Sequence, residues 1–281
     1  MKILIIATDF SSTAKNATSY AMDMAQALQA EVLLLHIYPL PVNYGDTAVP
    51  AGLVDWEKRT EDGLAGFKKQ LEQRTGGQVK VNTELRMGNF LTELGTVCDR
   101  VQPYAVIMGC KGTTAAERFL FGSHAISAMK HLAWPVITVP LEAKFKAVKK
   151  IGLACDLQDP EATVPLDEIN QLVTDFNASL HILNTGEQTY DPQAVFMSGW
   201  LGKKLRNVRP SFHFIEGNTD DAILSFAERN EVDLLVVLPH RHNIWDALIH
   251  RSHTKQFVLH SHIPLMALHD HEQPVNTSSK V

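Results

Sequence analysis

The sequence predicts an α/β protein of two tandem domains, each a parallel sheet with helices on both faces. Short apolar runs alternate with longer segments of helical periodicity along the 281 residues, which is typical of βαβ units. The order of these elements in the first half returns in the second half. With 45% hydrophobic residues, the chain can bury one large core or two modest ones.

Five apolar runs of the first half are predicted to be strands. They are Ile3–Ala7, Val32–Ile37, Val79–Leu85, Ala105–Met108 and Val136–Val139. Between the first two, apolar residues recur three and four positions apart from Ala17 to Leu28, which predicts a helix with one apolar face. A further helix is predicted over Ala125–Leu132. Strands and helices in alternation imply parallel pairing, with helices covering both faces of the sheet.

The second half repeats this order. Its predicted strands are Ile151–Ala154, Leu180–Leu183, Ser211–Ile215, Leu234–Leu238 and Leu265–Leu268. The segment Glu161–Phe176 is predicted to be one helix, with its apolar residues along one side. A constant offset in residue number superposes features of the two halves, and such ordered matches indicate a duplicated domain. The offset places Gly88 on Gly217, Ser123 on Ser252 and Pro135 on Pro264.

These patterns also predict the domain boundaries. We expect a first domain over residues 1–143 and a second, degenerate copy over residues 147–271. The lysine-rich stretch Ala143–Lys150 is the expected junction. Residues 272–281 are polar and lack periodicity, so we expect a disordered tail there.

A glycine motif follows the fourth predicted strand of the first half. It reads Gly109-Cys110-Lys111-Gly112, then nine residues, then Gly122-Ser123. Because glycine has no Cβ, a backbone with this spacing can wrap closely around phosphate oxygens. Gly122 also precedes a predicted helix, whose N-terminal N–H groups and dipole favour an anion. The motif predicts a phosphate-binding loop, and ordinary strand-to-helix turns with a glycine at each are the alternative interpretation.

Two familiar phosphate-binding patterns are absent, since the chain has neither GxxxxGK[ST] nor GxGxxG after its first strand.

In a doubly wound sheet the ligand lies beyond the carboxyl ends of the strands, where strand order reverses. If the first and fourth strands flank that point, Asp9 faces the Gly109 loop across one crevice. Its carboxylate can accept from an adenine amino group or a ribose hydroxyl, or help to hold a phosphate-bound Mg²⁺. The alternative role of Asp9 is to cap the following helix.

The second copy has lost the glycine motif. The offset that relates Gly88 to Gly217 puts Leu238, Arg241 and Arg251 in place of its glycines, and only the serine persists, as Ser252. Bulky side chains would occupy the space for phosphates, and Pro239 lacks a backbone donor. We expect this half to bind nucleotide weakly or not at all, although the two arginines could hold a smaller anion.

Together these residues resemble the universal stress protein family. The resemblance rests on the opening Ile-Ile-Ala-Thr-Asp-Phe-Ser, the strand ending in His36-Ile37, the Gly88-Asn89 turn, the Gly-x2-Gly-x9-Gly-Ser motif and the run Pro135-Val-Ile-Thr-Val139. It covers nearly the whole chain as two tandem domains. It implies Rossmann-like domains of the adenine nucleotide α-hydrolase-like type, each a five-stranded parallel sheet of order 3-2-1-4-5. The glycine motif is the one associated with ATP-binding members.

The resemblance also implies which residues bind ATP and Mg²⁺. Adenine is expected near Asp9 and the backbone of Ile37, and ribose near Gly109. The phosphates are expected on Gly112, Gly122, Ser123 and His124, and Lys111 fills a position that is often basic in the family. His124 stands where the family commonly has a small or apolar residue, so it contacts phosphate through its backbone N–H or turns its imidazole to solvent. The expected cofactor-binding residues are Thr8, Asp9, Ile37, Met108, Gly109, Lys111, Gly112, Gly122, Ser123 and His124.

Single-domain members of this family often dimerise through their last strand. By the same resemblance, Val136–Val139 is expected to pair with Leu265–Leu268 within this chain, which would cover two sheet edges at once. A further homodimer stays open. The connection from Pro39 to about Leu53 is long enough to lie over the adenine end of the crevice as a lid, or it is a passive surface loop.

Charge and composition argue against several partners and sites. The formal net charge of −5 argues against nucleic acid or an anionic membrane surface as the main partner. No apolar run approaches the ~20 residues that span a bilayer, and the opening run is too short for a signal peptide. Cys98, Cys110 and Cys155 are odd in number and widely spaced, which supports neither a disulfide framework nor a thiolate zinc site. We expect a cytoplasmic protein.

The leading functional hypothesis is an ATP-binding stress-response protein that acts as a nucleotide-dependent sensor or regulator through its first domain. Neither a nucleophilic triad nor a carboxylate pair is evident, so no catalytic residue is assigned. Slow ATP hydrolysis and a scaffold with an empty crevice are alternatives. A zinc site is another, because nine of the thirteen histidines lie at or beyond His213 and His250 and His253 could ligate Zn²⁺ from one helix face. Solvated surface histidines are the simpler interpretation, and no metal ligand is assigned.

Overall fold

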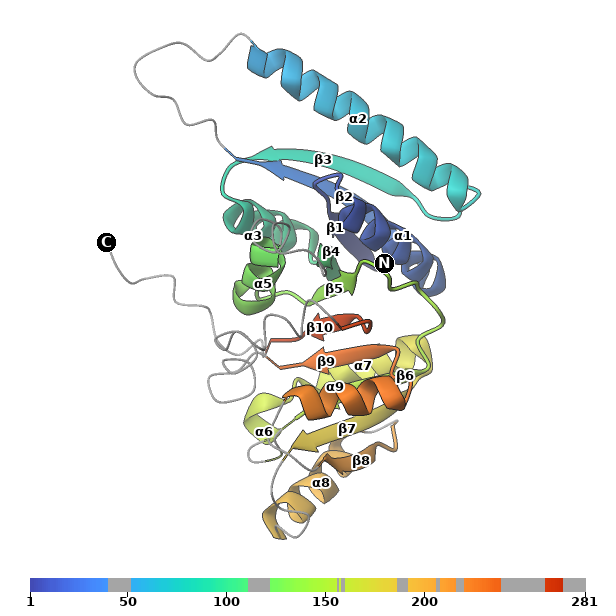
Figure 1. Ribbon diagram of the computed structural model, residues 1–281, viewed down its shortest axis with the longest axis vertical. Coiled ribbons are helices and arrows are strands. Elements are labelled where there is room, and N and C mark those ends of the chain that lie inside the picture. Colours follow the sequence, from blue (N-terminus) through green and yellow to red (C-terminus); the bar gives the residue numbers. More distant parts are fainter. Residues whose placement is uncertain are drawn as a thin grey trace, which may run out of the picture.

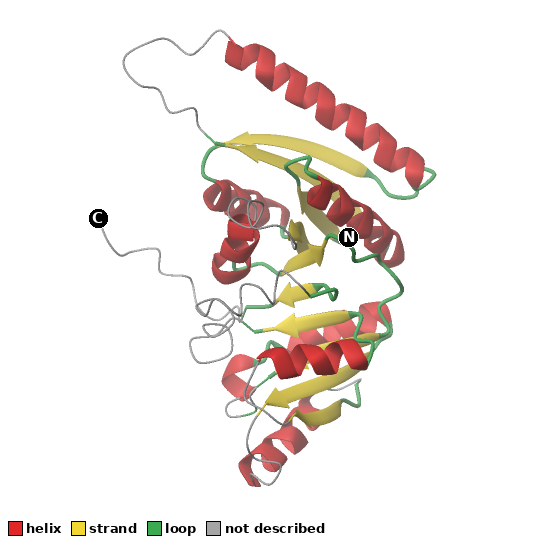
Figure 2. Cartoon of the chain, viewed as in Figure 1, coloured by secondary structure: helices red, strands yellow, loops and turns green. Residues whose placement is uncertain are grey.

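The computed structural model describes residues 1–39, 52–110, 122–155, 157, 160–185, 192–205, 208–215, 220–238 and 261–269. These residues form one long sheet with helices against both faces (Figures 1 and 2). The strands follow one another along the long axis of the molecule. The helix α2 (Gly52–Arg74) lies over one end of the sheet, and α8 (Pro192–Lys204) lies at the other.

The sheet has ten strands in the order β3-β2-β1-β4-β5-β10-β9-β6-β7-β8. The first domain supplies β1 (Ile3–Ala7), β2 (Glu31–Tyr38), β3 (Val81–Met87), β4 (Ala105–Cys110) and β5 (Val136–Pro140). The second supplies β6 (Lys150–Ala154), β7 (Ser179–Thr185), β8 (Ser211–Ile215), β9 (Leu234–Val237) and β10 (Leu265–Ala267). Each domain therefore has the strand order 3-2-1-4-5, as expected. β3 begins later than predicted, because Val79 is buried but precedes the ladder that pairs Val81 with Val32.

The two domains join edge to edge through β5 and β10. These strands pair antiparallel, with Met266 opposite Ile137 at the centre of the joint. Every other strand pair of the described residues is parallel. The expected pairing of the two last strands within one chain is therefore present. It leaves β3 and β8 as the edges of the described sheet.

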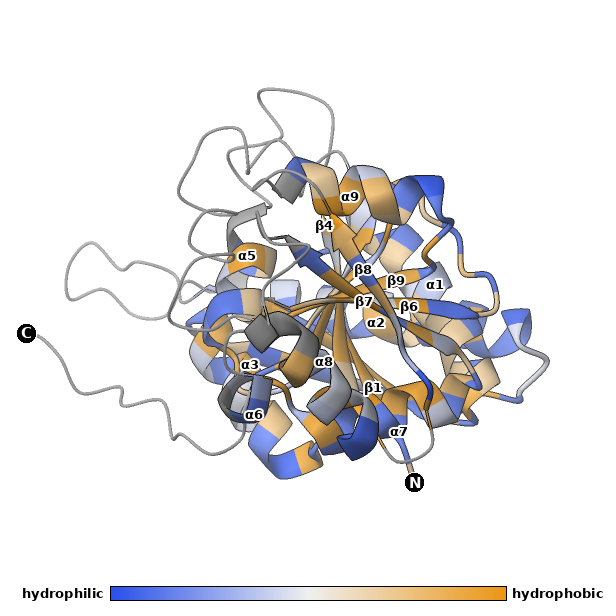
Figure 3. Ribbon diagram, turned by 90° about the horizontal axis from the view of Figure 1, so that it is seen from below, coloured by the Kyte–Doolittle hydropathy of each residue, from blue (hydrophilic) through white to orange (hydrophobic). Residues whose placement is uncertain are grey.

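Helices cover both faces of the sheet, as predicted. Against one face lie α1 (Ser12–Leu28), α2, α7 (Leu166–Phe176) and α8. Against the other lie α3 (Phe90–Val101), α5 (Gly122–His131) and α9 (Asp220–Arg229). Apolar strands occupy the middle of the molecule, and hydrophilic residues of the helices face outward (Figure 3). The core under α1 and α7 crosses the joint without a break, because Ile137 and Met266 belong to the same buried cluster as Ile6 and Ile151.

The first helix of each domain differs between the two copies. In the first domain α1 is continuous, and the Ser11 side chain caps it by accepting from the Ala14 N–H at 3.2 Å. In the second domain the prediction of one helix over Glu161–Phe176 is wrong, because a short α6 (Pro160–Thr163) is separated from α7. Pro165 causes the break, since it lacks an N–H and disfavours the helical conformation of the residue before it.

Strand pairing supports the duplication but requires two different offsets in residue number. For β4 and β9 it is the offset found in the sequence, because Val106 and Leu235 occupy the same place beside the last strand of their domain. For β1 and β6 the offset is larger, because Leu4 and Ile151 each lie opposite the first residue of the fourth strand. The longer connection between β2 and β3, which contains α2, accounts for the difference.

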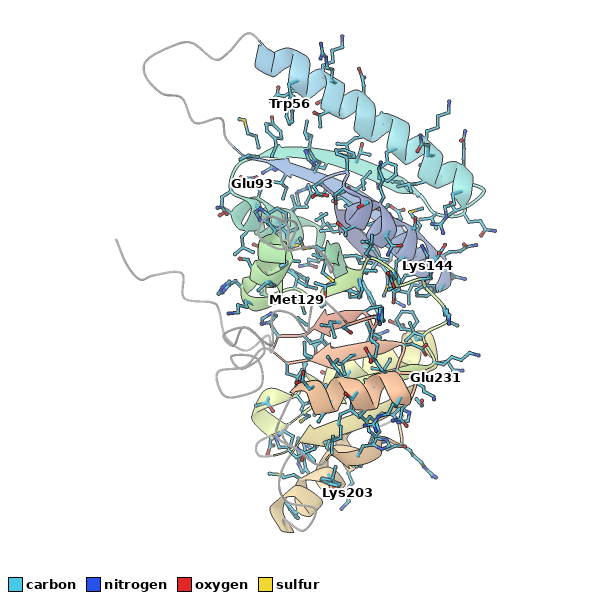
Figure 4. The ribbon with its side chains drawn as sticks, viewed as in Figure 1. Trp56, Glu93, Met129, Lys144, Lys203 and Glu231 are labelled. Carbon is cyan, nitrogen blue, oxygen red and sulfur yellow. The ribbon has the colours of Figure 1, made fainter. Side chains whose placement is uncertain are left out.

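The junction between the domains is fixed to α1. Asn16 Nδ2 donates to the carbonyl oxygens of Pro140 at 2.9 Å and Ala143 at 3.0 Å, and Asn16 Oδ1 accepts from Lys144 Nζ at 3.1 Å. Figure 4 labels Lys144 at this point of the chain. Val148, further along, is buried in the core. The connection is therefore packed against the first domain rather than free of it.

Two histidines form a hydrogen-bonded pair near the β8 edge of the sheet. His181 lies on β7 and His213 on β8, and Nδ1 of His181 is 3.0 Å from Nε2 of His213. Burial lowers the pKa of both imidazoles below the ordinary value of 6.5. For His181, the neighbouring His213 and Lys150 lower the pKa further. Both rings are therefore neutral at pH 7.

We expect this pair to make the protein less stable in mild acid. The pKa of each imidazole is lower in the folded state, so the unfolded chain takes up protons first as the pH falls. The contribution of the neutral pair to the free energy of unfolding is fully present above the ordinary pKa of 6.5. It is lost as the pH drops toward the lower pKa values of the folded state. Thermal denaturation at about pH 8 and about pH 5 tests this. The variant carrying His181→Gln and His213→Gln should lose less melting temperature over that interval than the parent, and an equal loss would contradict the prediction.

Candidate functional site

A cavity of about 350 Å³ lies at the carboxyl ends of β1, β2 and β4. β1 stands between β2 and β4, so the strand order reverses beside it. Doubly wound sheets bind their ligands at this point, and the volume is in the range of small-molecule sites. Among the residues that line the cavity are six that the sequence predicts to bind a cofactor, namely Thr8, Asp9, Ile37, Met108, Gly109 and His124.

The loop after β1 is held in place by hydrogen bonds to β2. The Thr8 N–H donates to the Leu35 carbonyl at 2.9 Å, and the Thr8 carbonyl accepts from Nδ1 of His36 at 2.7 Å. Thr8 Oγ1 accepts from the Phe10 N–H at 3.1 Å. These bonds hold Phe10 at a φ of 61°, a left-handed conformation that costs a non-glycine residue about 1–2 kcal/mol. The surrounding contacts therefore fix the shape of this loop.

Asp9 lies on this loop with its side chain exposed at the cavity. Its Oδ1 accepts from the Ser11 N–H at 3.0 Å. The cap of α1 is Ser11, so the alternative role of Asp9 as the helix cap is not what the structure shows. A carboxylate has about four acceptor positions, and the bond from Ser11 uses one of them. Asp9 therefore retains acceptor capacity for a ligand in the cavity.

Gly109 lies near the end of β4, between the buried Met108 and Cys110, where the first turn of α1 lies directly against the strand. A Cβ at Gly109 would lie 2.7 Å from the carbonyl carbon and from the oxygen of Thr13, and 3.0 Å from the nitrogen of Ala14. Backbone atoms cannot move aside as a flexible side chain can. Access for phosphate is therefore not what demands a glycine here, because the space of the missing Cβ is taken by α1.

The turn after β3 contributes cavity residues that are not among those expected. Gly88 has a φ of +152°, and a Cβ there would lie 2.9 Å from Cγ of Glu93, a residue labelled in Figure 4. Asn89 caps α3 by accepting at its Oδ1 from the N–H groups of Leu91 at 3.1 Å and Thr92 at 3.2 Å. The Gly-Asn pair recurs at Gly217, and this repetition is the signal that could have placed the turn among the expected cavity residues.

An aromatic contact closes the cavity on the side of α3 and α5. The rings of Phe90 and His124 have centroids 4.5 Å apart and planes tilted by 55°. His124 is exposed and lies in the first turn of α5. The imidazole of His124 is therefore not turned to solvent alone, because the ring also contacts Phe90.

Three helices begin at the cavity. They are α1 after Ser11, α3 after Asn89 and α5 at Gly122. The first turn of a helix presents N–H donors and the positive end of its dipole, so their convergence favours an anionic ligand. Gly122 and Ser123 open α5 as the motif predicts. Lys111 and Gly112 lie outside the described residues.

The model of the universal stress protein family matches residues 1–140 and again residues 147–269. The chain belongs to this family. A curated universal stress protein of Methanocaldococcus jannaschii is 28% identical over 138 residues, which cover 49% of this chain and 81% of the relative. One from Synechocystis is 22% identical over 95% of this chain and 99% of the relative. The crystal structure of a universal stress protein from Archaeoglobus fulgidus superposes with a TM-score of 0.72 at 15% identity, covering 95% of this chain and 98% of that one.

The second universal stress protein domain keeps the loop geometry of the first. The Cys155 N–H donates to the Leu183 carbonyl at 3.0 Å, and Asn184 Nδ2 donates to the Cys155 carbonyl at 2.9 Å. These are the counterparts of the two bonds that tie Thr8 to β2. Leu157 has a φ of 42° and is left-handed, as is Phe10 with a φ of 61° at the same place in the first domain. The same backbone turn is therefore built from different side chains.

The two universal stress protein domains differ at the end of the fourth strand. Leu238 stands in the place of Gly109, and in this domain Pro165 separates the first turn from the rest of the helix. A leucine side chain does not fit against a helix that approaches as closely as α1 does. The larger offset, which relates β1 to β6, puts Asp156 in the place of Asp9. Asp156 and the expected Arg241, Arg251 and Ser252 lie outside the described residues.

Cys98, Cys110 and Cys155 are all buried. Burial raises the pKa of the Cys98 and Cys110 thiols to about 12. Such thiols stay protonated at neutral pH, so Cys110 in the glycine motif is not a reactive nucleophile. In the part of the chain that the structure describes, no helix is long and apolar enough to cross a membrane.

Other expected features fall on residues that the structure does not describe. The connection from Pro39 to about Leu53, expected as a lid or a passive loop, lies mostly outside the described residues, which resume at Gly52. The tail over residues 272–281 also lies outside them, as do His250 and His253 of the suggested zinc site.

Proposed function

We propose that the first domain binds ATP with Mg²⁺ and that the protein acts as a nucleotide-dependent sensor or regulator in the stress response. The observation that carries this proposal is the convergence of three helix N-termini on the cavity beside β1. A triphosphate there would meet N–H donors and positive dipole ends. The glycine motif from Gly109 to Ser123 supports a triphosphate over a smaller anion, because it resembles that of the ATP-binding members of the family.

We place the base and the ribose at the apolar side of the cavity. Leu35, Ile37 and Met108 line that side, and apolar walls with a few polar groups are typical of sites for small molecules. The Asp9 carboxylate can accept from the adenine amino group or from a ribose hydroxyl. The triphosphate then extends toward the first turn of α5, where Gly122 and Ser123 lie.

The side chains around the cavity fit a phosphate-bound Mg²⁺. This ion usually takes one or two protein carboxylates, and phosphate oxygens and waters complete its octahedral shell. Asp9 supplies a carboxylate with free acceptor capacity, and holding the ion is the alternative to its contact with the base or the ribose. Bound Mg²⁺ would neutralise part of the phosphate charge, while the residues of the chain bind and orient the nucleotide.

The test is nucleotide binding by the variant Gly122→Asp. A carboxylate at the first position of α5 repels phosphates while it favours the helix N-terminus, so we expect ATP affinity to fall by at least about tenfold with the fold intact. Gly122→Ala is the matched control and should bind more tightly than the aspartate variant. Isothermal titration with ATP and Mg²⁺ measures both. Equal binding by parent and Gly122→Asp would contradict the proposed site.

The same preparations separate the competing functions. Phosphate release by the parent that disappears in Gly122→Asp would favour slow ATP hydrolysis over sensing. Absence of co-purifying nucleotide, together with no rise in melting temperature at millimolar ATP and Mg²⁺, would favour a scaffold. We also propose that the second domain binds nucleotide weakly or not at all, so the titration should give one site per chain. Two equal sites would overturn this asymmetry.

A further inference from the structure

We propose that His181 and His213 bind a divalent transition metal ion of the Zn²⁺ or Cu²⁺ class. The two residues lie on β7 and β8, which Figure 1 shows at the opposite end of the molecule from α2. They belong to the second domain, whereas the candidate nucleotide cavity lies in the first. The site is therefore independent of the proposed nucleotide binding.

The two imidazoles meet edge to edge. Their planes are only 18° apart and their centroids are 5.2 Å apart, yet Nδ1 of His181 lies 3.0 Å from Nε2 of His213. A contact between nitrogens that is so much shorter than the centroid separation means that each nitrogen points at the other ring. Two Zn–N bonds of 2.0–2.1 Å at a tetrahedral angle require nitrogens about 3.3 Å apart. The ion is therefore admitted when the nitrogens separate slightly and both rings tilt until their lone pairs converge on it.

Ser179 fixes the protonation of the first ring. Its hydroxyl donates to the Lys149 carbonyl at 3.1 Å, so its oxygen must accept in its contact of 3.1 Å with Nε2 of His181. His181 then carries its proton on Nε2 and has a bare Nδ1, which accepts from the Nε2–H of His213. The hydrogen bonds thus assign one nitrogen that is ready to ligate, and Ser179 holds it in the orientation that metal ligands require.

Binding needs no net loss of a proton. His213 must move its proton from Nε2 to Nδ1 through solvent, and the ring stays neutral. The ion then takes the place of the shared proton and accepts a lone pair from each nitrogen. Water completes the coordination shell, because no group of three or more His, Cys, Asp or Glu residues that could hold a metal occurs in the described ranges.

The surroundings of the two rings favour weak, exchangeable binding of the ion over tight binding. The ring of Phe226 on α9 lies 4.7 Å from that of His213, measured between centroids. Lys150 is the charged neighbour that acts on His181, and its ammonium donates to the Asn230 carbonyl at 2.9 Å. This cation opposes a second positive charge. We therefore expect the ion to bind reversibly. Cu²⁺ should bind more tightly than Zn²⁺, following the general order of affinities of nitrogen ligands for divalent metals.

The experiment is titration of the full chain, free of any histidine tag, with ZnCl₂ and with CuCl₂. Long-range imidazole NMR spectra identify each ring and its protonated nitrogen. Before metal is added, His181 should carry its proton on Nε2. With Zn²⁺, the resonances of His181 and His213 should shift together, and the His213 proton should appear on Nδ1. If these two rings stay unchanged while other histidines respond, the proposal is overturned.

Variants separate this pair from the other histidines. His181→Gln and His213→Gln should each lose the stoichiometric binding seen by calorimetry, and Ser179→Ala should weaken it by about tenfold. A chain carrying both His250→Gln and His253→Gln should bind as the parent does. Loss of binding in that control alone would overturn the proposal. If a variant at β7 or β8 fails to fold, the spectra of the parent still decide the question.

Discussion

Replacement of Gly109 by alanine is expected to lower the free energy of unfolding by about 2–4 kcal/mol. The new Cβ would lie 2.7 Å from two backbone atoms of Thr13, a separation that real contacts do not show. Relief requires α1 to move away from β4, and Ala14 and Ala17 on that helix are buried against the sheet. Urea denaturation followed by circular dichroism measures the change. Because Ser11 and Thr13 also line the cavity, ATP affinity should fall in the same variant.

Gly95→Ala is the matched control for this prediction. Gly95 lies inside α3, and among the described residues no atom other than the nearby backbone of α3 and its chain neighbours is within 4 Å of a Cβ built there. Alanine in a helix interior is favoured over glycine by up to about 1 kcal/mol, so this variant should be as stable as the parent or more stable. A similar loss in both variants would mean that the close contact between Gly109 and α1 is not the cause.

The fold was largely predictable because its signals are local. Apolar runs and helical spacing occur within single elements, and their repetition in two halves needs no knowledge of contacts. The prediction fails where one residue overrides a pattern. The apolar stripe of Glu161–Phe176 continues past Pro165, although the proline ends the hydrogen-bonded turn. A single offset between the two halves likewise missed the counterpart of Asp9, because the connection containing α2 lengthens only the first domain.

The candidate site was only partly predictable because it is assembled from distant segments. Five of the six expected residues that line the cavity lie at the carboxyl ends of strands, as the rule for such sheets requires. They are Thr8 and Asp9 directly after β1, Ile37 near the end of β2, and Met108 and Gly109 near the end of β4, whereas His124 lies on α5. Phe90 comes from another turn, and its contact with His124 joins helices that are well separated in sequence. Gly109 was predicted to lie at the site, but the physical reason for a glycine at this position was not predicted. Close packing of Thr13 against β4 depends on the tertiary approach of α1, which spacing does not report.

Substitution of Ile137 by aspartate is expected to destabilise both domains together, by about 4 kcal/mol or more. Ile137 is fully buried and pairs with Met266 at the antiparallel joint. A carboxylate there has neither water nor a cationic partner within the apolar core, and burial of an unpaired charge is strongly unfavourable. The core cluster extends from Ile6 through Ile137 to Ile151, so the damage should reach strands on both sides of the joint.

The shape of the unfolding transition shows whether the joint couples the two domains. If one core spans it, the parent unfolds in a single calorimetric transition, and Ile137→Asp shifts that transition as a whole. Leu141→Asp is the control, because Leu141 directly follows β5 and is 38% exposed, so a charge there should change stability by less than about 1 kcal/mol. Two transitions in the parent, of which Ile137→Asp moves only one, would show domains that fold independently. The β5–β10 ladder would then serve as a contact surface rather than as part of a common core.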